Sequence, residues 1–327
     1  MATVNTVTGP VEVSDLGQTS MHEHFVYGFP GHQFDISVDC FKEERDLPIL
    51  IKEAELFKSL GYKTLVDASV VDTGRNPELL KKISETVGIN IICVSGWYAD
   101  MYAATSYWVG RASMGADIDS EIYESFVTET TKGIGFTDIK AGMLKISTSF
   151  NQITDYEKHF ISACAKASRD TGRPITTHAD GSTMGLEQAG LLLEAGAQPE
   201  RVLIGHMCGC TDTEYLKKIL ALGVNIGFDR FGIEGFDFMM TPTDEERVTT
   251  LIALLKDGYA DQIMLGHDTV KIDLGRPFKL SPAAQKFKDH TTPRVVVEFV
   301  LPRLREAGIS DADIEKLMVG NPAKFLA

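Results

Sequence analysis

Eight short strand-like runs recur along the chain, and amphipathic helix-like segments lie between them. The runs are Gln18–His24, Thr64–Ser69, Asn90–Ser95, Gly142–Ser147, Pro174–His178, Val202–His206, Asn225–Asp229 and Gln262–Asp268. Buried strands that alternate with helices are typical of a parallel sheet covered by helices. Eight such units within about 300 residues predict a (β/α)₈ TIM barrel. A doubly wound open sheet is the alternative, and the lack of a glycine-rich loop after the first run argues against it.

The predicted helices share apolar residues at helical spacing, and a glycine follows several of them where a C-cap is expected. They are Leu47–Leu60, Pro77–Val87, Ser120–Lys132, Tyr156–Thr171, Met184–Ala195, Asp212–Leu222, Asp244–Asp257 and Arg294–Ala307. Two β-prone runs around Gly9-Pro10 predict a short N-terminal β-hairpin. Because the sequence contains no linker or low-complexity segment, we expect residues 1–327 to form a single domain.

The charge and cysteine content exclude several classes of partner. A net charge of −14 argues against nucleic acid, which needs clustered Lys and Arg, and against an anionic membrane surface. No apolar run approaches the roughly 20 residues of a membrane span, and the N-terminus does not resemble a signal peptide. The cysteines form no CxxC pair and are odd in number: Cys40, Cys93, Cys164, Cys208 and Cys210. We therefore expect a cytoplasmic protein with a small-molecule substrate.

Residues that bind metals lie at or near the ends of five predicted strands. They are His22 and His24, Lys145, His178, His206 and Asp268. In a parallel barrel these ends meet at one face, and His22 and His24, two apart, project from the same side of a strand. Each residue alone could be an ordinary hydrogen-bonding core residue, but their joint placement favours a metal site. The set is too large for one tetrahedral zinc ion and suits two ions.

Lys145 is the unexpected member of this set. Two ions roughly 3.5–4 Å apart need a bridging anion, which histidine cannot supply. A lysine beside two dications would have a lowered pKa, and its neutral amine could react with CO₂. The resulting carbamate would offer one oxygen to each metal.

These motifs resemble the ligand motifs of the phosphotriesterase family of the amidohydrolase superfamily. The matching segments are Met21-His-Glu-His24, Leu144-Lys-Ile146, Thr177-His178, Ile204-Gly-His206, Gly266-His-Asp268 and the C-terminal Gly320-Asn-Pro-Ala-Lys-Phe325. The resemblance implies a binuclear centre, with zinc as the first choice of metal and cobalt, manganese or iron as alternatives. It implies that His22, His24 and Asp268 hold the more buried ion. His178 and His206 would hold the other, with carboxylated Lys145 as the bridge.

Within that family, Gly96-Trp-Tyr98 and Phe228-Asp-Arg-Phe-Gly232 resemble the phosphotriesterase-like lactonases. This implies that Tyr98 and Arg230 contact the substrate. The structural alternatives are a tyrosine that covers the barrel wall and an arginine paired with Asp229 or Glu234. Many relatives carry an acidic residue at the position of Gly209, so a proton relay through that position is not expected here.

We therefore expect a homodimeric hydrolase that opens lactone rings, N-acyl-homoserine lactones among them, by attack of a hydroxide bridging the metals. Asp268 would transfer the proton, and the loop Thr269–Thr292 would form a lid. Phosphotriester hydrolysis is one alternative, and hydrolysis of phosphorylated sugar lactones is another. The second alternative depends on the cations of that loop, Lys271, Arg276, Lys279, Lys286 and Lys288. The non-enzymatic alternative is a metal-free binding protein on the same barrel.

Overall fold

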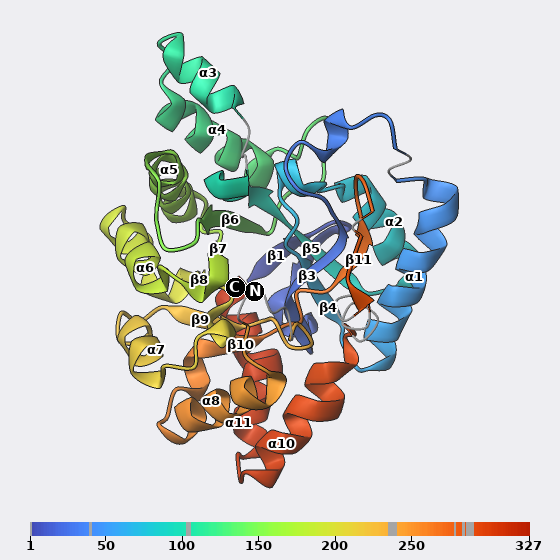
Figure 1. Ribbon diagram of the computed structural model, residues 1–327, viewed down its shortest axis with the longest axis vertical. Helices are drawn as coiled ribbons and strands as arrows, with labels where there is room; N and C mark the ends of the chain where they lie inside the picture. The colour runs from blue at the N-terminus through green and yellow to red at the C-terminus, as the bar shows by residue number, and fades with distance from the viewer. Residues whose placement is uncertain are drawn as a thin grey trace.

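The computed structural model describes residues 2–38, 41–102, 106–234, 241–277, 279–282, 285 and 291–327. A parallel sheet lies at the centre, and helices surround it (Figure 1). Its strands follow the order β10-β9-β8-β7-β6-β5-β4-β3-β11. The bounds are β3 (Thr19–Tyr27), β4 (Thr64–Asp67), β5 (Asn90–Gly96), β6 (Met143–Thr148), β7 (Ile175–Ala179), β8 (Val202–Ile204), β9 (Asn225–Phe228), β10 (Ile263–Leu265) and β11 (Val270–Asp273). The prediction of a (β/α)₈ barrel is confirmed.

The eighth barrel strand is interrupted, and its two parts close the barrel. β10 pairs with β9, whereas β11 pairs in parallel with β3, the first barrel strand. Between the two parts, the Asp268 N–H donates to the His22 carbonyl at 2.9 Å. The expected strand Gln262–Asp268 is therefore wrong at its end, as is the expectation that a loop begins at Thr269. At the break, Asp268 has a φ of 56°, in the left-handed region that a strand does not contain.

The helices form the outer layer of the barrel. They are α1 (Glu43–Ser59), α2 (Pro77–Val87), α4 (Ile118–Thr131), α5 (Asp155–Thr171), α6 (Gly185–Glu194), α7 (Thr213–Leu220), α8 (Asp244–Lys256), α10 (Leu301–Glu306), α11 (Asp311–Glu315) and α12 (Asn321–Leu326). A further helix that the sequence analysis did not predict, α3 (Tyr107–Ser113), projects at the top of Figure 1. The expected helix Arg294–Ala307 is α10 preceded by a π-helix over Val296–Val300. None of these helices is both long and apolar enough to cross a membrane within the residues described.

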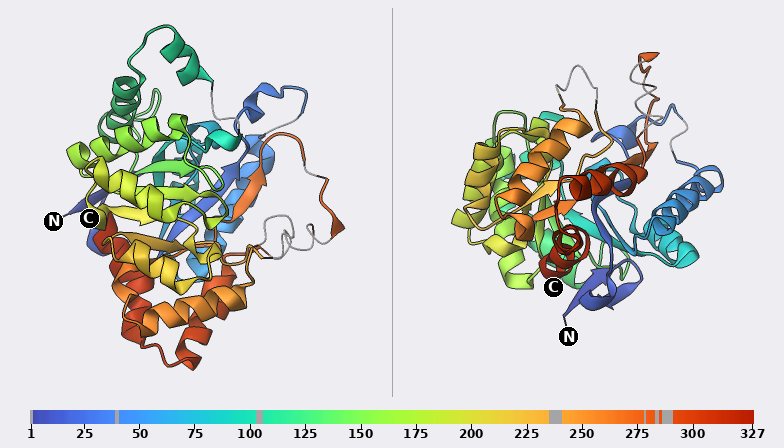
Figure 2. Two further views of the ribbon diagram at one scale, coloured as in Figure 1. Left: turned by 60° about the vertical axis from the view of Figure 1, so that its left-hand side comes forward. Right: turned by 90° about the horizontal axis from the view of Figure 1, so that it is seen from below.

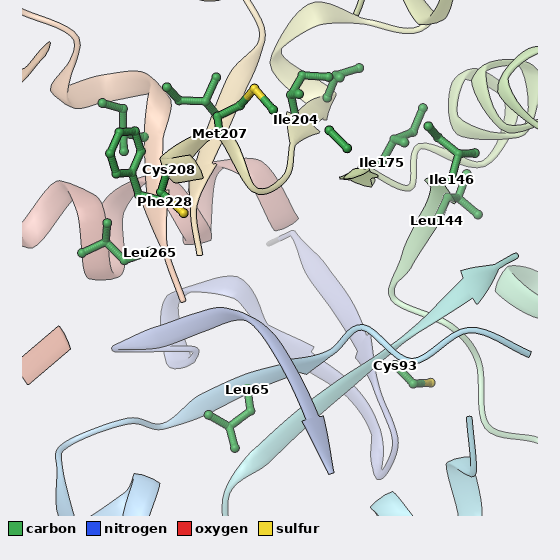
Figure 3. Packing of buried hydrophobic residues seen from close by; sticks show 14 of the residues in the cluster. Leu65, Cys93, Leu144, Ile146, Ile175, Ile204, Met207, Cys208, Phe228 and Leu265 are labelled. Atoms are coloured by element: carbon green, nitrogen blue, oxygen red, sulfur yellow. The ribbon is translucent and has the colours of Figure 1, made fainter. Parts of the chain in front are cut away.

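Strand residues alternate between two apolar clusters. Outward-facing residues such as Leu65, Leu144 and Ile175 pack against the helices (Figure 3). Inward-facing residues such as Met21 and Met143 belong to a second cluster inside the barrel. Its other buried members are Val4, Leu16, Val66, Val70, Ile92, Val94, Leu203, Met264, Phe325 and Leu326. This cluster fills the N-terminal end of the barrel and leaves the C-terminal end to the polar residues.

The predicted hairpin is present as β1 (Thr3–Thr6) and β2 (Gly9–Glu12), an antiparallel pair. Val4 of β1 joins the inner cluster together with Phe325 and Leu326 of α12, so both ends of the chain pack under the barrel. Figure 2 shows the two termini side by side in both views. Cys40 lies outside the described residues, and Cys93, Cys164, Cys208 and Cys210 are free thiols.

Candidate metal centre

The structure brings all six predicted ligands together at the C-terminal ends of the strands. His22 and His24 lie on β3, Lys145 on β6 and His178 on β7, and all four side chains are buried. His206 lies two residues after β8 and Asp268 three residues after β10, and each has a left-handed backbone, with φ of 64° and 56°. Such a conformation is strained for a residue other than glycine and often marks a functional site.

Three of the ligands and Lys145 surround one point. The His24 Nε2 lies 3.2 Å from Asp268 Oδ1, and the His22 Nε2 lies 3.7 Å from the same oxygen. The Lys145 Nζ lies 3.1 Å from His22 Nε2 and donates to the Ala68 carbonyl at 2.8 Å. Ligands held about 2.0–2.1 Å from a tetrahedral zinc ion lie roughly 3.3 Å from one another. The spacing of His22, His24 and Asp268 therefore fits a divalent ion.

A second pair of imidazoles lies beside this group. The His178 Nδ1 and the His206 Nε2 are 2.9 Å apart, and His206 Nε2 is 4.0 Å from Asp268 Oδ2. Asp268 thus faces both groups with different oxygens. The two groups together offer enough donors for two ions.

Three of the imidazoles are each oriented by a hydrogen bond on the side of the ring that faces away from the centre. The His24 Nδ1 lies 2.8 Å from Ser69 Oγ, and the His178 Nε2 lies 3.2 Å from Asp180 Oδ2. The His206 Nδ1 lies 3.0 Å from Asp229 Oδ1. In each ring the other nitrogen faces the centre, which is the usual arrangement around a metal.

Sequence analysis missed the roles of Asp180 and Asp229. Asp229 is fully buried, and its Oδ2 lies 3.5 Å from His22 Nδ1 without a hydrogen-bond partner among the described residues. Burial by itself would raise the pKa of Asp229, but His206 and His22 hold that pKa well below its usual range. Asp229 therefore links one imidazole of each group as an anion. The available signal was its position at the end of the predicted strand Asn225–Asp229, which we interpreted only as a partner for Arg230.

The ionisation of the site suits metal binding. Burial lowers the pKa of His178 to about 4, and it also lowers the pKa values of His22 and His206. These imidazoles are therefore neutral at pH 7, the form that binds metals. Burial likewise lowers the pKa of Lys145 to about 8, which makes its neutral amine accessible near neutral pH.

Tyr98 and Arg230 both line a cavity of about 250 Å³ above this centre. The Arg230 Nε donates to Asp268 Oδ2 at 2.8 Å, and this is the ion pair that Arg230 makes within the described part of the chain, where neither Asp229 nor Glu234 pairs with it. Tyr98 stacks on Tyr102, with ring centroids 5.2 Å apart, and contacts the ring of His178 at 4.9 Å. The cavity wall also contains the apolar side chains Phe29, Ile233, Val270 and Leu274.

The site of Gly209 leaves no room for a side chain, so the acidic residue considered at this position does not fit. A Cβ atom at this position would lie 2.0 Å from Ser182 Oγ. That hydroxyl donates to the His206 carbonyl at 2.5 Å and is therefore held in place. Glycine is the residue that fits here.

The chain is similar to known proteins over nearly its whole length. The profile of the phosphotriesterase family matches residues 2–326. An aryldialkylphosphatase of Saccharolobus solfataricus is 32% identical over 328 residues, which cover 97% of each chain. Among solved structures, the organophosphorus hydrolase from Deinococcus radiodurans superposes with a TM-score of 0.95 at 41% identity, covering 99% of this chain and 97% of that one. A mutant of a PTE-like lactonase from the same organism has a TM-score of 0.95 at 40% identity, covering 99% and 100%.

Proposed function

The chain belongs to the phosphotriesterase family and is a hydrolase acting on esters, and from that premise we propose that it opens neutral γ- and δ-lactones. N-acyl-homoserine lactones are included in this class. The observation that carries the proposal is the composition of the cavity wall: Arg230 and Tyr98 lie near Asp268, and Phe29, Ile233, Val270 and Leu274 form an apolar part of the wall. Tyr27 and Asp273 are the polar wall residues besides these and the proposed metal ligands. A flat, neutral ester ring with an alkyl substituent suits such a wall.

We further propose that the centre holds two divalent ions, with zinc as the first choice. His22, His24 and Asp268 would hold one ion, His178 and His206 the other, and Lys145 would bridge them as a carbamate. When bound, such ions polarise a carbonyl oxygen and lower the pKa of a water molecule toward neutrality. The spacing of the donor atoms and the neutral imidazoles support this assignment.

The protein's own residues have separate tasks in this proposal. Burial raises the pKa of Tyr98 well above its ordinary value, so its hydroxyl stays protonated and can donate to an oxygen that gains charge. Arg230 supplies a permanent positive charge at the same wall. Asp268 stays ionised, because Arg230 and the neighbouring histidines outweigh the effect of burial and hold its pKa well below its usual range. As a carboxylate it would accept a proton from the attacking water and pass it to the ring oxygen that leaves.

The cations that follow β10 in the chain do not favour a phosphorylated substrate. Lys271 pairs with Glu53 at 2.5 Å, and Arg276 pairs with Asp35 at 2.6 Å. Neither side chain lines the cavity, and Lys279 is exposed. Lys286 and Lys288, like part of the expected lid Thr269–Thr292, lie outside the described residues.

The deciding experiment measures kcat/KM for the metal-loaded enzyme on three substrate types. These are alkyl-substituted γ- and δ-lactones with homoserine lactones, an aryl dialkyl phosphate, and a phosphorylated sugar lactone. We expect the neutral lactones to exceed both other types by at least about tenfold. A higher kcat/KM for the phosphate triester or the phosphorylated lactone would replace this proposal with the corresponding alternative. Light scattering on the same preparation tests the proposed homodimer.

A further inference from the structure

Arg247 on α8 is a wholly buried cation outside the metal centre. Its Nη1 donates to the Arg230 carbonyl at 2.8 Å and to Asp244 Oδ1 at 2.7 Å, and its Nη2 donates to the Ile233 carbonyl at 2.5 Å. A buried charge is costly unless it is paired and hydrogen-bonded. Two of the three acceptors belong to the loop that follows β9, so Arg247 serves that loop as well as its own helix.

The two residues that Arg247 holds by their carbonyls, Arg230 and Ile233, both line the substrate cavity. The intervening main chain is tied to the same helix. The Gly232 N–H donates to Asp244 Oδ2 at 2.9 Å, and the Asp244 N–H donates to Glu234 Oε2 at 2.6 Å. The backbone from Arg230 to Glu234 is thus attached to the first turn of α8.

We propose that Arg247 is a positioning residue that fixes one wall of the cavity by holding the backbone of Arg230 and Ile233. The Arg230 guanidinium reaches Asp268 Oδ2 at 2.8 Å, and that reach depends on where its main chain lies. A displacement of about 1 Å in a substrate-positioning group can lower the rate on the order of a hundredfold. The inference uses the proposed function only in treating Arg230 as a substrate contact.

The test compares Arg247→Met, which keeps the length but removes the donors, with Arg303→Met as a matched control. Arg303 on α10 also pairs with α8, through Glu245 at 3.2 Å, but it lies on the outer face and is 45% exposed. We expect Arg247→Met to lower kcat/KM at least about tenfold with unchanged metal content, and Arg303→Met to leave it within about twofold. Unchanged kcat/KM in Arg247→Met would overturn the proposal.

A double-mutant cycle with Arg230→Met separates positioning from a general loss of structure. If Arg247 acts through Arg230, adding Arg247→Met to Arg230→Met should lower kcat/KM by less than about threefold further. If the loss of kcat/KM in the double variant equals the product of the two single losses, Arg247 acts independently of Arg230 and the proposal is overturned. Should Arg247→Met fail to fold, Arg247→Lys takes its place in the cycle. It keeps the charge but cannot reach both carbonyls, and a kcat/KM equal to wild type would contradict the inference.

Hydrogen exchange gives a readout that needs no substrate. In Arg247→Met, the amides of the peptide spanning residues 230–234 should exchange at least about tenfold faster than in wild type, and in Arg303→Met they should not. Unchanged exchange in Arg247→Met would overturn the proposal that Arg247 holds this backbone. The kinetic cycle uses whichever ester the wild type hydrolyses, a δ-lactone or an aryl dialkyl phosphate. If the wild type does not hydrolyse lactones, the proposed function is refuted, but the role of Arg247 can still be tested with the phosphate ester.

Discussion

Among single residues, Lys145 is the one whose proposed chemistry depends most on its surroundings. Its buried amine lies against His22 Nε2, and burial lowers its pKa to about 8. We predict that Lys145→Ala loses metal and lowers kcat at least about 100-fold. Mutation of residues that only hydrogen-bond metal ligands already lowers metal affinity or activity about 10–100-fold, and Lys145 is a proposed ligand itself. Acetate or propionate added with metal should partly restore both, because a carboxylate can replace the carbamate bridge.

The measurements are metal content by mass spectrometry and turnover of the lactone that the wild type prefers. Lys140→Ala removes an exposed lysine and serves as the control. An unmodified Lys145 in a metal-loaded crystal, together with no rescue by short acids, would contradict the carbamate.

Asp268 combines two proposed roles that one substitution can separate. It faces both imidazole groups and accepts a hydrogen bond from Arg230. We predict that Asp268→Asn lowers kcat by on the order of 10²–10⁴, because a general acid–base group is lost, while KM changes little. The comparison is made at equal metal content. If restoring the metal restores turnover, Asp268 is a ligand only.

At the scale of elements, the interruption of the eighth strand is what places Asp268. Between β10 and β11 the ladder to the neighbouring strands is interrupted, and the Glu23 carboxylate of β3 accepts hydrogen bonds from the backbone there. Its Oε1 accepts from the His267 N–H at 3.1 Å, and its Oε2 accepts from the Thr269 N–H at 3.0 Å and the Thr269 hydroxyl at 2.6 Å. Because Glu23 holds the residues on both sides of Asp268, it supports the left-handed turn between them.

We predict that Glu23→Gln lowers the free energy of unfolding of the metal-free protein by about 1–3 kcal/mol. An amide has one acceptor oxygen where the carboxylate has two, so buried N–H or O–H groups lose a partner. Metal should also bind more weakly, since Asp268 is less well held. Urea unfolding and metal titration measure the two effects, with Glu187→Gln on the exposed face of α6 as the control. Normal stability and metal affinity in Glu23→Gln would argue against this role.

For the whole molecule, the neutral histidines at the centre make the metal-free protein sensitive to acid. Folding lowers the pKa of His178 from 6.5 to about 4, and it lowers those of His22 and His206 as well. Between these values the unfolded chain binds protons that the folded chain does not, so the free energy of unfolding falls as the pH drops from 6.5 to 4. Asp229 and Asp268, whose folded pKa values are also lowered, extend the loss below pH 3.8.

We predict that His178 alone costs the metal-free protein on the order of 3 kcal/mol over that range, at about 1.36 kcal/mol per pKa unit. Urea unfolding after treatment with a chelator at pH 7.5, 6 and 5 measures the loss, and His178→Asn should reduce the slope. Bound metal should raise stability at every pH, because it binds only the folded chain. A flat profile between pH 7.5 and 5 would contradict the prediction.

The sequence by itself determined the barrel and the positions of the six ligand candidates. Both depend on local patterns: apolar strands alternate with helices, and strand ends in a parallel barrel meet at one face. His22 and His24 share a side of β3 because strand residues alternate. Asp268 lies at the centre, and the adjacent His267 packs against Phe57 and Tyr62.

Only the tertiary structure decided what holds these residues in place. Glu23 and His267 are 244 positions apart, and no local pattern connects them. Local patterns likewise do not predict that Asp229 contacts both His206 and His22. They do not predict the bond from Arg230 to Asp268, or the bond from Arg247 to the Arg230 carbonyl in the loop that follows β9. The break in the eighth strand was also missed, because the propensity of Gln262–Asp268 for a strand is overcome by hydrogen bonds from the distant β3. Local spacing predicts which side chains reach the centre, but non-local hydrogen bonds set their orientation and charge.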